Sequence, residues 1–463
     1  MATMEWKRAA CPYDCPDCCG LLVRTDGQRI YEVKGDPEHP VTKGFLCRKM
    51  AHYERTVHHP GRLCTPLRRT GKKGAGEFVP ISWEEAAAEI AGRWKDLIAR
   101  YGAECILPYS YAGTEQKIQF SCGHAFFARL GATDLERTIC AKAKDAGFAQ
   151  IIGATPGQNP RDLARCDYIL IWGSNVTATW LHAHAEILEA KRRGAHVVLV
   201  ETYATPAASL ADEVVLVRPG TDAYLALAMD RVLRDEGKID RAFLERSTVG
   251  WEEFLASLDR YTAEEAERIT GVTPAQLRSV ARGFAAAKSP VILFGTGMSR
   301  HGNGAMAVRC VTTLAAVTGA FSRPFGGIVG NVSSSMAYDL NLIERPDFGR
   351  PGVRSVNMNQ LGSALCELRD PPIMSLYVYS SNPACIAPNQ SAVLRGLERE
   401  DLFTVVHERF MTDTARYADI VLPADTAMEH ADLAASYGNL CIQKSDAVIA
   451  PLGECKSNFD TFA

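Results

Sequence analysis

The chain has 463 residues, with 51 lysines and arginines against 54 aspartates and glutamates, and a formal charge of −3. Its 47% hydrophobic and 23% charged residues are typical of globular proteins and exclude intrinsic disorder and fibrous architectures. The length predicts two to four domains. Nucleic-acid-binding proteins usually carry an excess or a stripe of basic residues, and this sequence has neither, so no nucleic-acid partner is expected.

Neither a membrane span nor an export signal is expected. The longest apolar stretches are short, for example Tyr168–Trp172 and Val291–Phe294, whereas a helix needs roughly 18 apolar residues to cross a bilayer. Residues 1–8 lack the apolar region and the paired arginines of an export signal. We therefore expect a cytoplasmic protein. In a reducing cytosol its 15 cysteines are expected to be metal ligands, catalytic groups or core residues.

The first 60 residues form a small segment rich in Cys, Gly, Pro and charged residues. Alternating patterns at Gly20–Arg24 and Arg29–Val33 predict two strands joined by a turn at Asp26-Gly27. Because such a unit buries little apolar surface, a metal centre is the expected source of its stability.

A helix is predicted next. Ser82 and Glu85 have the spacing of a capping box, apolar residues then recur at helical spacing, and Gly102 ends the pattern.

From about residue 105, apolar runs alternate with segments of helical length such as Ala183–Arg193 and Ala223–Arg234. The expected strands are Tyr168–Trp172, His196–Val200, Glu213–Val217, Val291–Phe294, Leu376–Tyr379, Phe403–Val406 and Ile420–Leu422. This alternation predicts an α/β fold with mainly parallel, Rossmann-like sheets behind the small β-rich N-terminal domain.

Small or hydrogen-bonding residues follow six of these runs, at the strand ends where open α/β sheets bind ligands. They are Gly173, Ser174, Asn175, Glu201, Thr202, Gly220, Thr221, Asp222, Gly295, Thr296, Gly297, Ser380, Ser381, Asn382, Pro383, His407 and Glu408. Any one of these segments is explained equally well as a simple turn. The set as a whole favours a large ligand with phosphate and heterocyclic parts.

The strongest motif consists of Cys11, Cys15, Cys18 and Cys19, followed after a gap by Cys47. Three close thiolates and one distant thiolate are typical of an iron–sulfur cluster or a structural zinc site. Zinc ribbons usually have a second cysteine pair, so a single distant cysteine favours iron–sulfur; reduced core cysteines are the remaining interpretation. The three-residue spacings select Cys11, Cys15 and Cys19, although the adjacent Cys18 leaves the third ligand ambiguous.

With the later motifs, this pattern resembles the bis-molybdopterin guanine dinucleotide oxidoreductase (DMSO reductase) superfamily over essentially the whole chain. Besides the cysteines, the resemblance rests on Cys47–Lys49, Ile81–Ala86, Arg137–Cys140, Trp172–Asn175, Arg218–Asp222, Ser381–Pro383, Val406–Glu408 and Thr412–Pro423. Each piece is weak alone, and the ordered set is specific. The resemblance implies a [4Fe–4S] cluster, a bis-molybdopterin guanine dinucleotide and molybdenum or tungsten.

The resemblance also implies roles for individual residues. The [4Fe–4S] cluster would be held by Cys11, Cys15, Cys19 and Cys47. Lys49 would lie between the cluster and one pterin, where a cation favours an electron arriving on either side. Cys140 would bind the molybdenum or tungsten, and a soft thiolate suits such a metal.

One guanine dinucleotide would be bound by Gly173, Ser174, Asn175, Glu201, Thr202, Gly220, Thr221 and Asp222, with the Asp222 carboxylate accepting from guanine. The pterins or the second nucleotide would be contacted by Gly295, Gly297, Asn382 and Glu408. His182 and His184 are two apart on a predicted helix and do not share a face, so both are expected to be ordinary helix residues.

Two departures from the superfamily pattern matter. Ala141-Lys142 follow Cys140, where formate dehydrogenases have a histidine, which disfavours formate as substrate. The sequence stops at Ala463, where relatives continue into a domain that completes the grip on the second pterin cofactor. This implies either a fragment or a separate C-terminal chain.

The predicted domains are 1–62 for the cluster, 63–135 plus 330–463 for a discontinuous α/β domain, and 136–329 for an inserted dinucleotide-type domain. The predicted function is a molybdenum- or tungsten-dependent oxidoreductase that acts on a small molecule and exchanges single electrons with a redox partner protein. Three alternatives remain open: a non-redox hydratase or transhydroxylase, a non-catalytic subunit resembling the iron–sulfur subunit of complex I, and a zinc-stabilised binding module.

Overall fold

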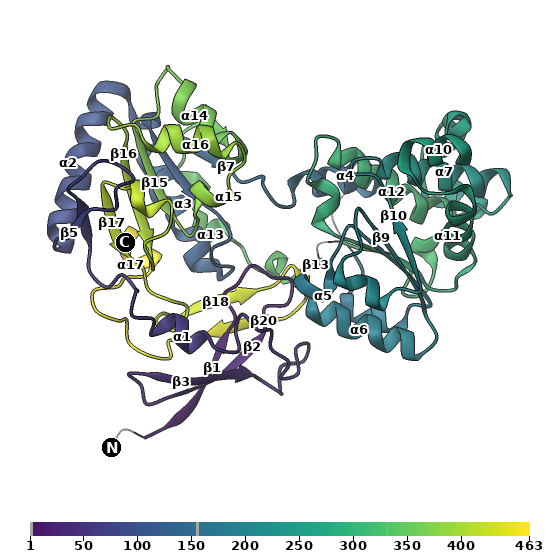
Figure 1. The fold of residues 1–463 in the computed structure, drawn as a ribbon, viewed down its shortest axis with the longest axis horizontal. Helices are drawn as coiled ribbons and strands as arrows, with labels where there is room; N and C mark the ends of the chain where they lie inside the picture. Colours follow the sequence, from purple (N-terminus) through teal and green to yellow (C-terminus); the bar gives the residue numbers. More distant parts are fainter. Residues whose placement is uncertain (1–2, 154–156, 331) are drawn as a thin grey trace.

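The computed structural model describes residues 3–153, 157–330 and 332–463. Figure 1 shows two lobes side by side, with the small N-terminal sheet lying against one of them. The predicted α/β fold with a β-rich N-terminal region is confirmed. No helix in the described part of the chain is both long and apolar enough to span a membrane.

The N-terminal sheet consists of three antiparallel strands, β1 (Glu5–Ala10), β2 (Gly20–Thr25) and β3 (Ile30–Gly35). The predicted turn joins β2 to β3, and Asp26 Oδ1 accepts from the backbone amides of the two residues after Gly27 at 2.9 and 2.8 Å. The buried face of the sheet packs against Tyr53 and Val57 of α1 (Tyr53–Val57) and against Met428, Val448 and Ile449. The sheet is therefore anchored to the C-terminal part of the chain.

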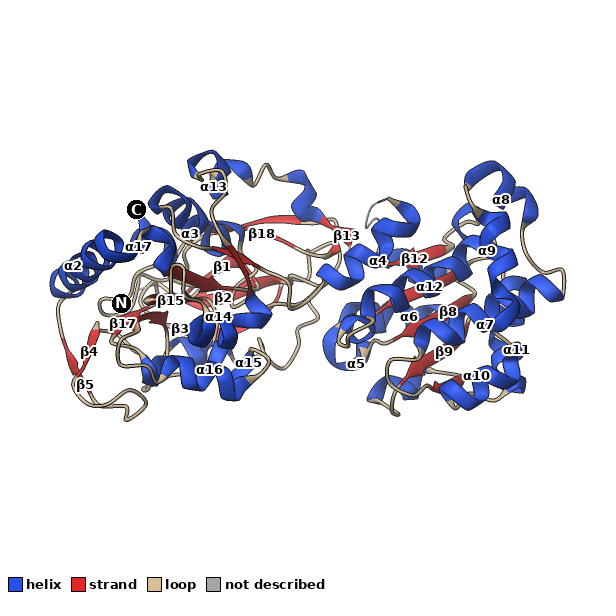
Figure 2. Cartoon of the chain, turned by 90° about the horizontal axis from the view of Figure 1, so that it is seen from above, coloured by secondary structure: helices blue, strands red, loops and turns tan. Residues whose placement is uncertain are grey.

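The lobe on the right of Figure 1 is built on a five-stranded, all-parallel sheet in the order β10-β9-β8-β11-β12. Its strands are β8 (Tyr168–Trp172), β9 (His196–Glu201), β10 (Glu213–Leu216), β11 (Pro290–Phe294) and β12 (Gly327–Val329). Its helices are α4 (Lys142–Ile152), α5 (Val176–Thr179), α6 (Leu181–Arg192), α7 (Asp222–Asp235), α8 (Arg241–Ser247), α9 (Trp251–Ser257), α10 (Ala263–Thr270), α11 (Pro274–Ala286) and α12 (Gly304–Val317). Helices cover both faces of the sheet (Figure 2).

The other lobe is built on a six-stranded sheet in the order β5-β4-β17-β16-β15-β6. Its strands are β4 (Leu67–Arg69), β5 (Phe78–Pro80), β6 (Ile106–Ser110), β15 (Ser375–Tyr379), β16 (Phe403–Glu408) and β17 (Ile420–Pro423). The last four named strands are parallel, and β4 and β5 extend the sheet in antiparallel pairs. Its helices are α2 (Trp83–Tyr101), α3 (Lys117–Leu130), α13 (Asn341–Glu344), α14 (Leu361–Glu367), α15 (Pro383–Ile386), α16 (Gln390–Leu397) and α17 (Asn458–Phe462).

Three two-stranded sheets complete the fold. The pairs are β7 (Asp134–Glu136) with β14 (Ser355–Asn357), β13 (Val332–Ser333) with β19 (Gly438–Asn439), and β18 (Asp432–Ala435) with β20 (Ile442–Ser445). All strands of the five-stranded sheet lie within 168–329, and the six-stranded sheet takes strands from both sides of that range. The division into a discontinuous and an inserted domain stays a prediction.

Candidate cofactor site

The N-terminal cysteine motif lies mainly in the loop between β1 and β2, with Cys47 supplied from just before α1. The backbone amide of Cys11 donates to Cys19 O at 2.9 Å, which closes the loop on itself. Burial raises the pKa of Cys11 to about 12, and the nearby Cys47 raises it further while Lys49 lowers it. The pKa of Cys19 is raised by burial and then by Cys11, Cys15 and Cys47. The four predicted cluster ligands therefore lie near enough to influence one another's ionisation.

Cys18 is oriented differently. Its Sγ lies 3.8 Å from Cys11 O and 3.6 Å from Gln443 Nε2, and its side chain packs with Ala10 and Ala434. Its φ of 45° is in the left-handed region, which turns the chain between its two neighbours. The groups that act on its thiol include Cys11 but not Cys15 or Cys47.

Within the described residues, no three His, Cys, Asp or Glu side chains are placed to share one metal ion. A structural zinc requires such convergence, because all its ligands bind the same atom. A [4Fe–4S] cluster takes four thiolates on its several iron atoms and does not require them to meet at one point.

Cys140 and Lys49 line the same cavity, of about 440 Å³, between the two lobes. Cys140 lies two residues before the first residue of α4, and Arg300 from the segment after β11 brings Nη2 to 4.0 Å from its Sγ. Arg300 Nη1 also donates to Ile139 O at 2.7 Å. Burial raises the pKa of the Cys140 thiol, and Tyr111 and Arg300 oppose that rise. Arg300, which follows β11 of the five-stranded sheet, thus holds the turn that carries the predicted metal ligand.

Lys144, not Lys142, is the lysine of α4 that lines this Cys140 cavity. Burial lowers the pKa of Lys144 to about 8. Lys142 is exposed and lines a separate cavity with His124 and Arg137. The sequence did not predict which of the two lysines lines the Cys140 cavity, because the direction of each side chain depends on where α4 begins.

A second cavity, also of about 440 Å³, lies at the carboxyl ends of β8, β9, β10 and β11. Of the residues predicted to bind a dinucleotide or a pterin, it is lined by Gly173, Ser174, Asn175, Glu201, Thr202, Gly220, Asp222 and Gly297. Gly295 lines the Cys140 cavity instead. Thr221 lines neither, and its Oγ1 donates to Arg218 O at 2.7 Å. The two cavities share Ser174, Thr179, Thr296 and Arg300, so they adjoin.

The polar atoms of this Asp222 cavity are only partly paired. Asp222, the first residue of α7, is buried and accepts from Trp172 Nε1 at 2.8 Å. Burial raises the pKa of Glu201, and the Asp222 carboxylate adds to the rise. Asn175 Oδ1 and His301 Nε2 are buried and have no hydrogen-bond partner among the described residues. Because buried polar atoms are nearly always paired in a complete site, these orphaned atoms fit a polar ligand such as a nucleotide.

Gly295 and Gly297 lie where the turn after β11 packs against the turn after β8, and the two turns lie too close together for a side chain at either position. A Cβ at Gly295 would lie 1.8 Å from Gly173 O, and one at Gly297 would lie 2.8 Å from the same oxygen. Their lack of a side chain is thus explained by packing against the turn after β8. That packing brings the turns after β8 and β11 together where the two cavities adjoin.

A third cavity, of about 220 Å³, contains the remaining predicted residues, Asn382 and Glu408. Asn382 Oδ1 accepts from Thr414 N at 3.1 Å and from Thr414 Oγ1 at 2.7 Å, so this oxygen holds the neighbouring loop. Burial raises the pKa of Glu408. Ser381 Oγ is buried and lacks a partner among the described residues, which again fits a missing polar ligand.

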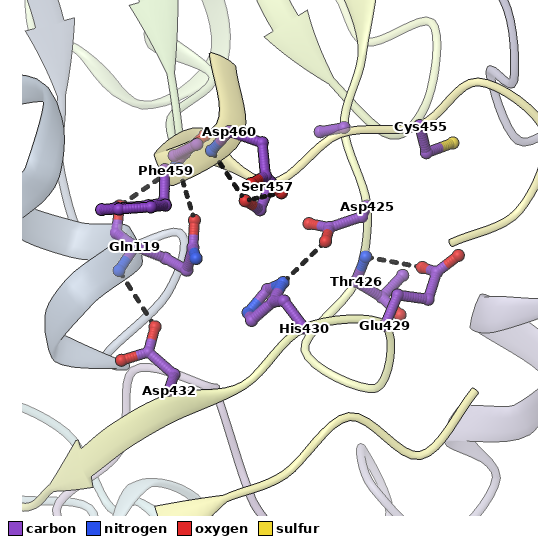
Figure 3. A network of polar contacts seen from close by, with 12 residues as sticks. Gln119, Asp425, Thr426, Glu429, His430, Asp432, Cys455, Ser457, Phe459 and Asp460 are labelled. Atoms are coloured by element: carbon purple, nitrogen blue, oxygen red, sulfur yellow. Dashed lines mark hydrogen bonds and ion pairs between the residues drawn. The ribbon is translucent and has the colours of Figure 1, made fainter. Parts of the chain in front are cut away.

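A network of polar contacts forms the wall of this Glu408 cavity (Figure 3). His430 Nδ1 lies 2.8 Å from Asp425 Oδ2, and its Nε2 lies 3.0 Å from Gln116 Oε1. Asp432 accepts from the backbone amides of Ile118 and Gln119 at the start of α3, at 2.8 and 2.9 Å. Sequence reasoning missed His430 and Asp425, since no spacing rule links them to the other cavity residues.

His182 also has a role that was not anticipated. Its Nδ1 lies 2.8 Å from the carboxylate of Asp17 in the cluster loop, and its ring makes an edge contact with Phe45. His184 stays within its own lobe, with Nδ1 3.1 Å from Thr177 Oγ1. The two histidines do point to different surroundings, as expected from their spacing.

Comparison with known proteins identifies the family. The family model for molybdopterin oxidoreductase matches residues 62–463, and the model for its Fe4S4 domain matches residues 4–59. The probable oxidoreductase YoaE of Bacillus subtilis is 42% identical over 98% of this chain and 67% of its own length. The dimethyl sulfoxide reductase DmsA of Escherichia coli is 29% identical over 98% of this chain and 62% of its own length. The solved acetylene hydratase of Pelobacter acetylenicus has the same fold, with a TM-score of 0.85 and 23% identity over 98% of this chain and 68% of its own. The chain belongs to the molybdopterin oxidoreductase family, as its sequence motifs predicted, and carries that family's Fe4S4 domain at its N-terminal end.

Proposed function

We propose that the chain is a molybdenum- or tungsten-dependent oxidoreductase that uses bis-molybdopterin guanine dinucleotide and one [4Fe–4S] cluster. The observation that carries this proposal is the position of Lys49. Its side chain lines the cavity of Cys140, and its charge also lowers the pKa of Cys11 and Cys15. One cation thus lies between the proposed metal ligand and the proposed cluster, where it favours electron transfer in either direction.

The proposed cluster ligands are Cys11, Cys15, Cys19 and Cys47. The orientation of Cys18 toward Gln443 and Ala434 supports Cys19 as the third ligand. Each of these thiols must lose its proton to bind iron. Burial raises the pKa of Cys11, so its ionisation depends on the iron and on the charge of Lys49.

In the proposed arrangement, one guanine dinucleotide occupies the Asp222 cavity, where Asn175 and His301 offer unpaired polar atoms. Trp172 donates to Asp222 Oδ1 and so orients the carboxylate toward the N–H edge of guanine. The second pterin or nucleotide occupies the Glu408 cavity, next to the unpaired Ser381 Oγ.

When bound, the cofactor supplies a metal that cycles through a two-electron change as a small substrate gains or loses an oxygen atom or a hydride equivalent. Cys140 would hold that metal, and Arg300 donates to Ile139 O and so fixes the turn that carries Cys140. Lys49 would place a positive charge between this cavity and the cluster loop. The [4Fe–4S] cluster would supply a site for single electrons to and from a redox partner protein.

The decisive measurement is the content of Mo, W, Fe and Zn per chain in anaerobically purified protein, for wild type and for Cys140→Ala. We expect iron near four and molybdenum or tungsten near one in the wild type, with the activity lost in the variant. Iron without molybdenum or tungsten would mean either a non-catalytic subunit or a chain that cannot retain its pterins by itself, and zinc without iron would contradict the proposal. A Cys140→Ala variant that kept metal and activity would refute the ligand assignment.

Dependence on an added electron acceptor or donor separates an oxidoreductase from a non-redox hydratase or transhydroxylase. We expect turnover to require an acceptor if the substrate is oxidised, or a donor if it is reduced, and to slow in Lys49→Met, while the iron content stays unchanged. Turnover with neither acceptor nor donor would support the hydratase alternative. We also propose a cytoplasmic location, because all 15 cysteines are free thiols. In addition, we propose that a separate chain completes the second cofactor site.

A further inference from the structure

Two cysteines outside the proposed cofactor site, Cys64 and Cys455, come together where segments from the two ends of the chain run side by side. The backbone amide of Glu454 donates to Cys64 O at 2.8 Å. The Cys455 thiol donates to Leu63 O at 3.2 Å, next to Cys64 in the chain, and the Cys64 thiol is near enough to raise the pKa of Cys455. Cys455 lies two residues before Ser457, the N-cap of α17 (Figure 3). Main-chain bonds therefore hold the two sulfur atoms within reach of each other.

Gly453 makes this approach possible. Its φ of 58° is in the left-handed region, and a Cβ there would lie 2.8 Å from Cys64 Cβ and 2.9 Å from Cys64 O. A larger residue at this position would push the two segments apart.

The two thiols differ in exposure and in charge environment. Cys64 is partly exposed, whereas Cys455 is only 5% exposed. Burial raises the pKa of Cys455 to about 12. The other charged groups that face it are Arg62, whose Nη2 lies 3.4 Å from the sulfur, and Glu429, which pairs with Arg62 at 2.9 Å. Arg62 favours the thiolate of Cys455 once an outside reagent has reacted at Cys64.

We propose that Cys64 and Cys455 form a reversible disulfide by exchange with a low-molecular-weight disulfide such as oxidised glutathione. The Cys64 thiolate attacks the reagent, forming a mixed disulfide and releasing one glutathione. The Cys455 thiolate then attacks the Cys64 sulfur, breaking the mixed disulfide and releasing the second glutathione. Two protein thiols are oxidised, one oxidised glutathione is reduced to two thiols, and both protein protons leave with the products.

The disulfide would act on the wall of the Glu408 cavity. Lys456, next to Cys455, accepts at its carbonyl from Asp425 N and donates from its amide to Pro423 O, each at 3.1 Å. Arg62 Nη2 also donates to Ala424 O at 3.1 Å. A covalent link at Cys455 would therefore restrain the segment that carries Asp425.

The experiment incubates the purified full chain with oxidised glutathione, blocks free thiols with iodoacetamide and maps tryptic peptides by mass spectrometry. Peptides Leu63–Arg68 and Ser445–Lys456 each contain a single cysteine. We expect most of both peptides to appear as one linked species that dithiothreitol separates. Absence of that species, or linkage of Cys64 to the exposed Cys385 as often as to Cys455, would overturn the proposal.

Single variants test the order of the two steps. In Cys455→Ser, the partly exposed Cys64 should retain one glutathione. In Cys64→Ser, the buried Cys455 should remain unmodified. Equal glutathionylation of the two variants would contradict the assignment of Cys64 as the thiol that reacts first. The mapping of the wild-type chain decides the disulfide itself, whether or not either variant folds.

Discussion

His182 Nδ1 lies 2.8 Å from the carboxylate of Asp17, and this contact ties α6 of one lobe to the cluster loop. Both side chains are nearly buried, with 10% and 4% of their side-chain surfaces exposed. If one partner of such a pair is removed, the other stays buried without the polar contact that offsets its loss of hydration. The contact therefore couples the position of the inserted lobe to the geometry of the proposed cluster site.

His182→Ala is expected to destabilise the protein by about 1–3 kcal/mol, because it leaves the Asp17 carboxylate buried without its partner. The variant should also lose iron faster than the wild type on exposure to air, since Asp17 lies between two proposed cluster ligands. His184→Ala is the matched control, because His184 contacts Thr177 within its own lobe. Thermal unfolding and timed iron analysis check both expectations. Equal iron loss from the two variants would show that the contact of His182 with Asp17 does not stabilise the cluster loop.

The carboxylate of Asp222 gives a second prediction, which concerns the proposed nucleotide. Asp222→Asn should retain an acceptor for Trp172 Nε1 but place an amide against the donors of guanine. Asp222→Ala should in addition lose about 1–3 kcal/mol of stability, since it leaves the Trp172 donor unpaired in the core. We expect both variants to contain less guanine per chain, as measured by chromatography of the acid extract.

Thr221→Ala is the control for this measurement, because Thr221 faces Arg218 O rather than the cavity. It should leave the guanine content unchanged. If Asp222→Asn contained as much guanine as the wild type, Asp222 would not be a guanine-binding residue.

Local sequence rules predicted much of this fold. The strand Tyr168–Trp172 was predicted to the residue, and the capping box of Ser82 and Glu85 is present at the start of α2. These elements are determined by residues close together in the chain. The strand β1 was missed because Glu5–Ala10 contains no β-branched residue and is stabilised by pairing with β2.

The site was predicted less completely, for physical reasons. Sequence spacing could not separate Cys18 from Cys19, since adjacent residues differ only in the direction that the backbone gives each side chain. The partners of His182 and His430 come from distant segments that only the folded chain brings together. Glycine at position 295 was assigned to ligand contact, although the approach of Gly173 already requires it.

Gly295 supports a third prediction. Gly295→Ala would place a methyl group 1.8 Å from Gly173 O, so the turns after β8 and β11 must separate. We expect a loss of about 1–3 kcal/mol, typical of overpacking in a tight site, and a weaker grip on the proposed nucleotide. Gly302→Ala is the control, since a Cβ there meets nothing within 4 Å. Chemical denaturation of both variants checks the difference, and equal stabilities would mean that the turns can separate freely.

The last prediction concerns Asp230, which is fully buried in α7 and accepts from Thr313 Oγ1 of α12 at 2.6 Å. Burial raises the pKa of Asp230 well above its ordinary value. The folded chain therefore holds a proton that the unfolded chain releases, so the associated stability is full below the ordinary aspartate pKa and falls as pH rises through the folded value.

Asp230→Asn should abolish this dependence, because the amide does not titrate. Relative to the variant, the wild type should lose thermal stability as pH rises above the ordinary aspartate pKa toward the raised value of Asp230. Asp235→Asn on the same helix should show the opposite trend, since Arg234 and Arg231 lower the pKa of Asp235 and its stabilising effect disappears as pH falls. Melting temperatures across the pH series test both signs. A constant difference between wild type and Asp230→Asn would show that Asp230 does not change its protonation on unfolding.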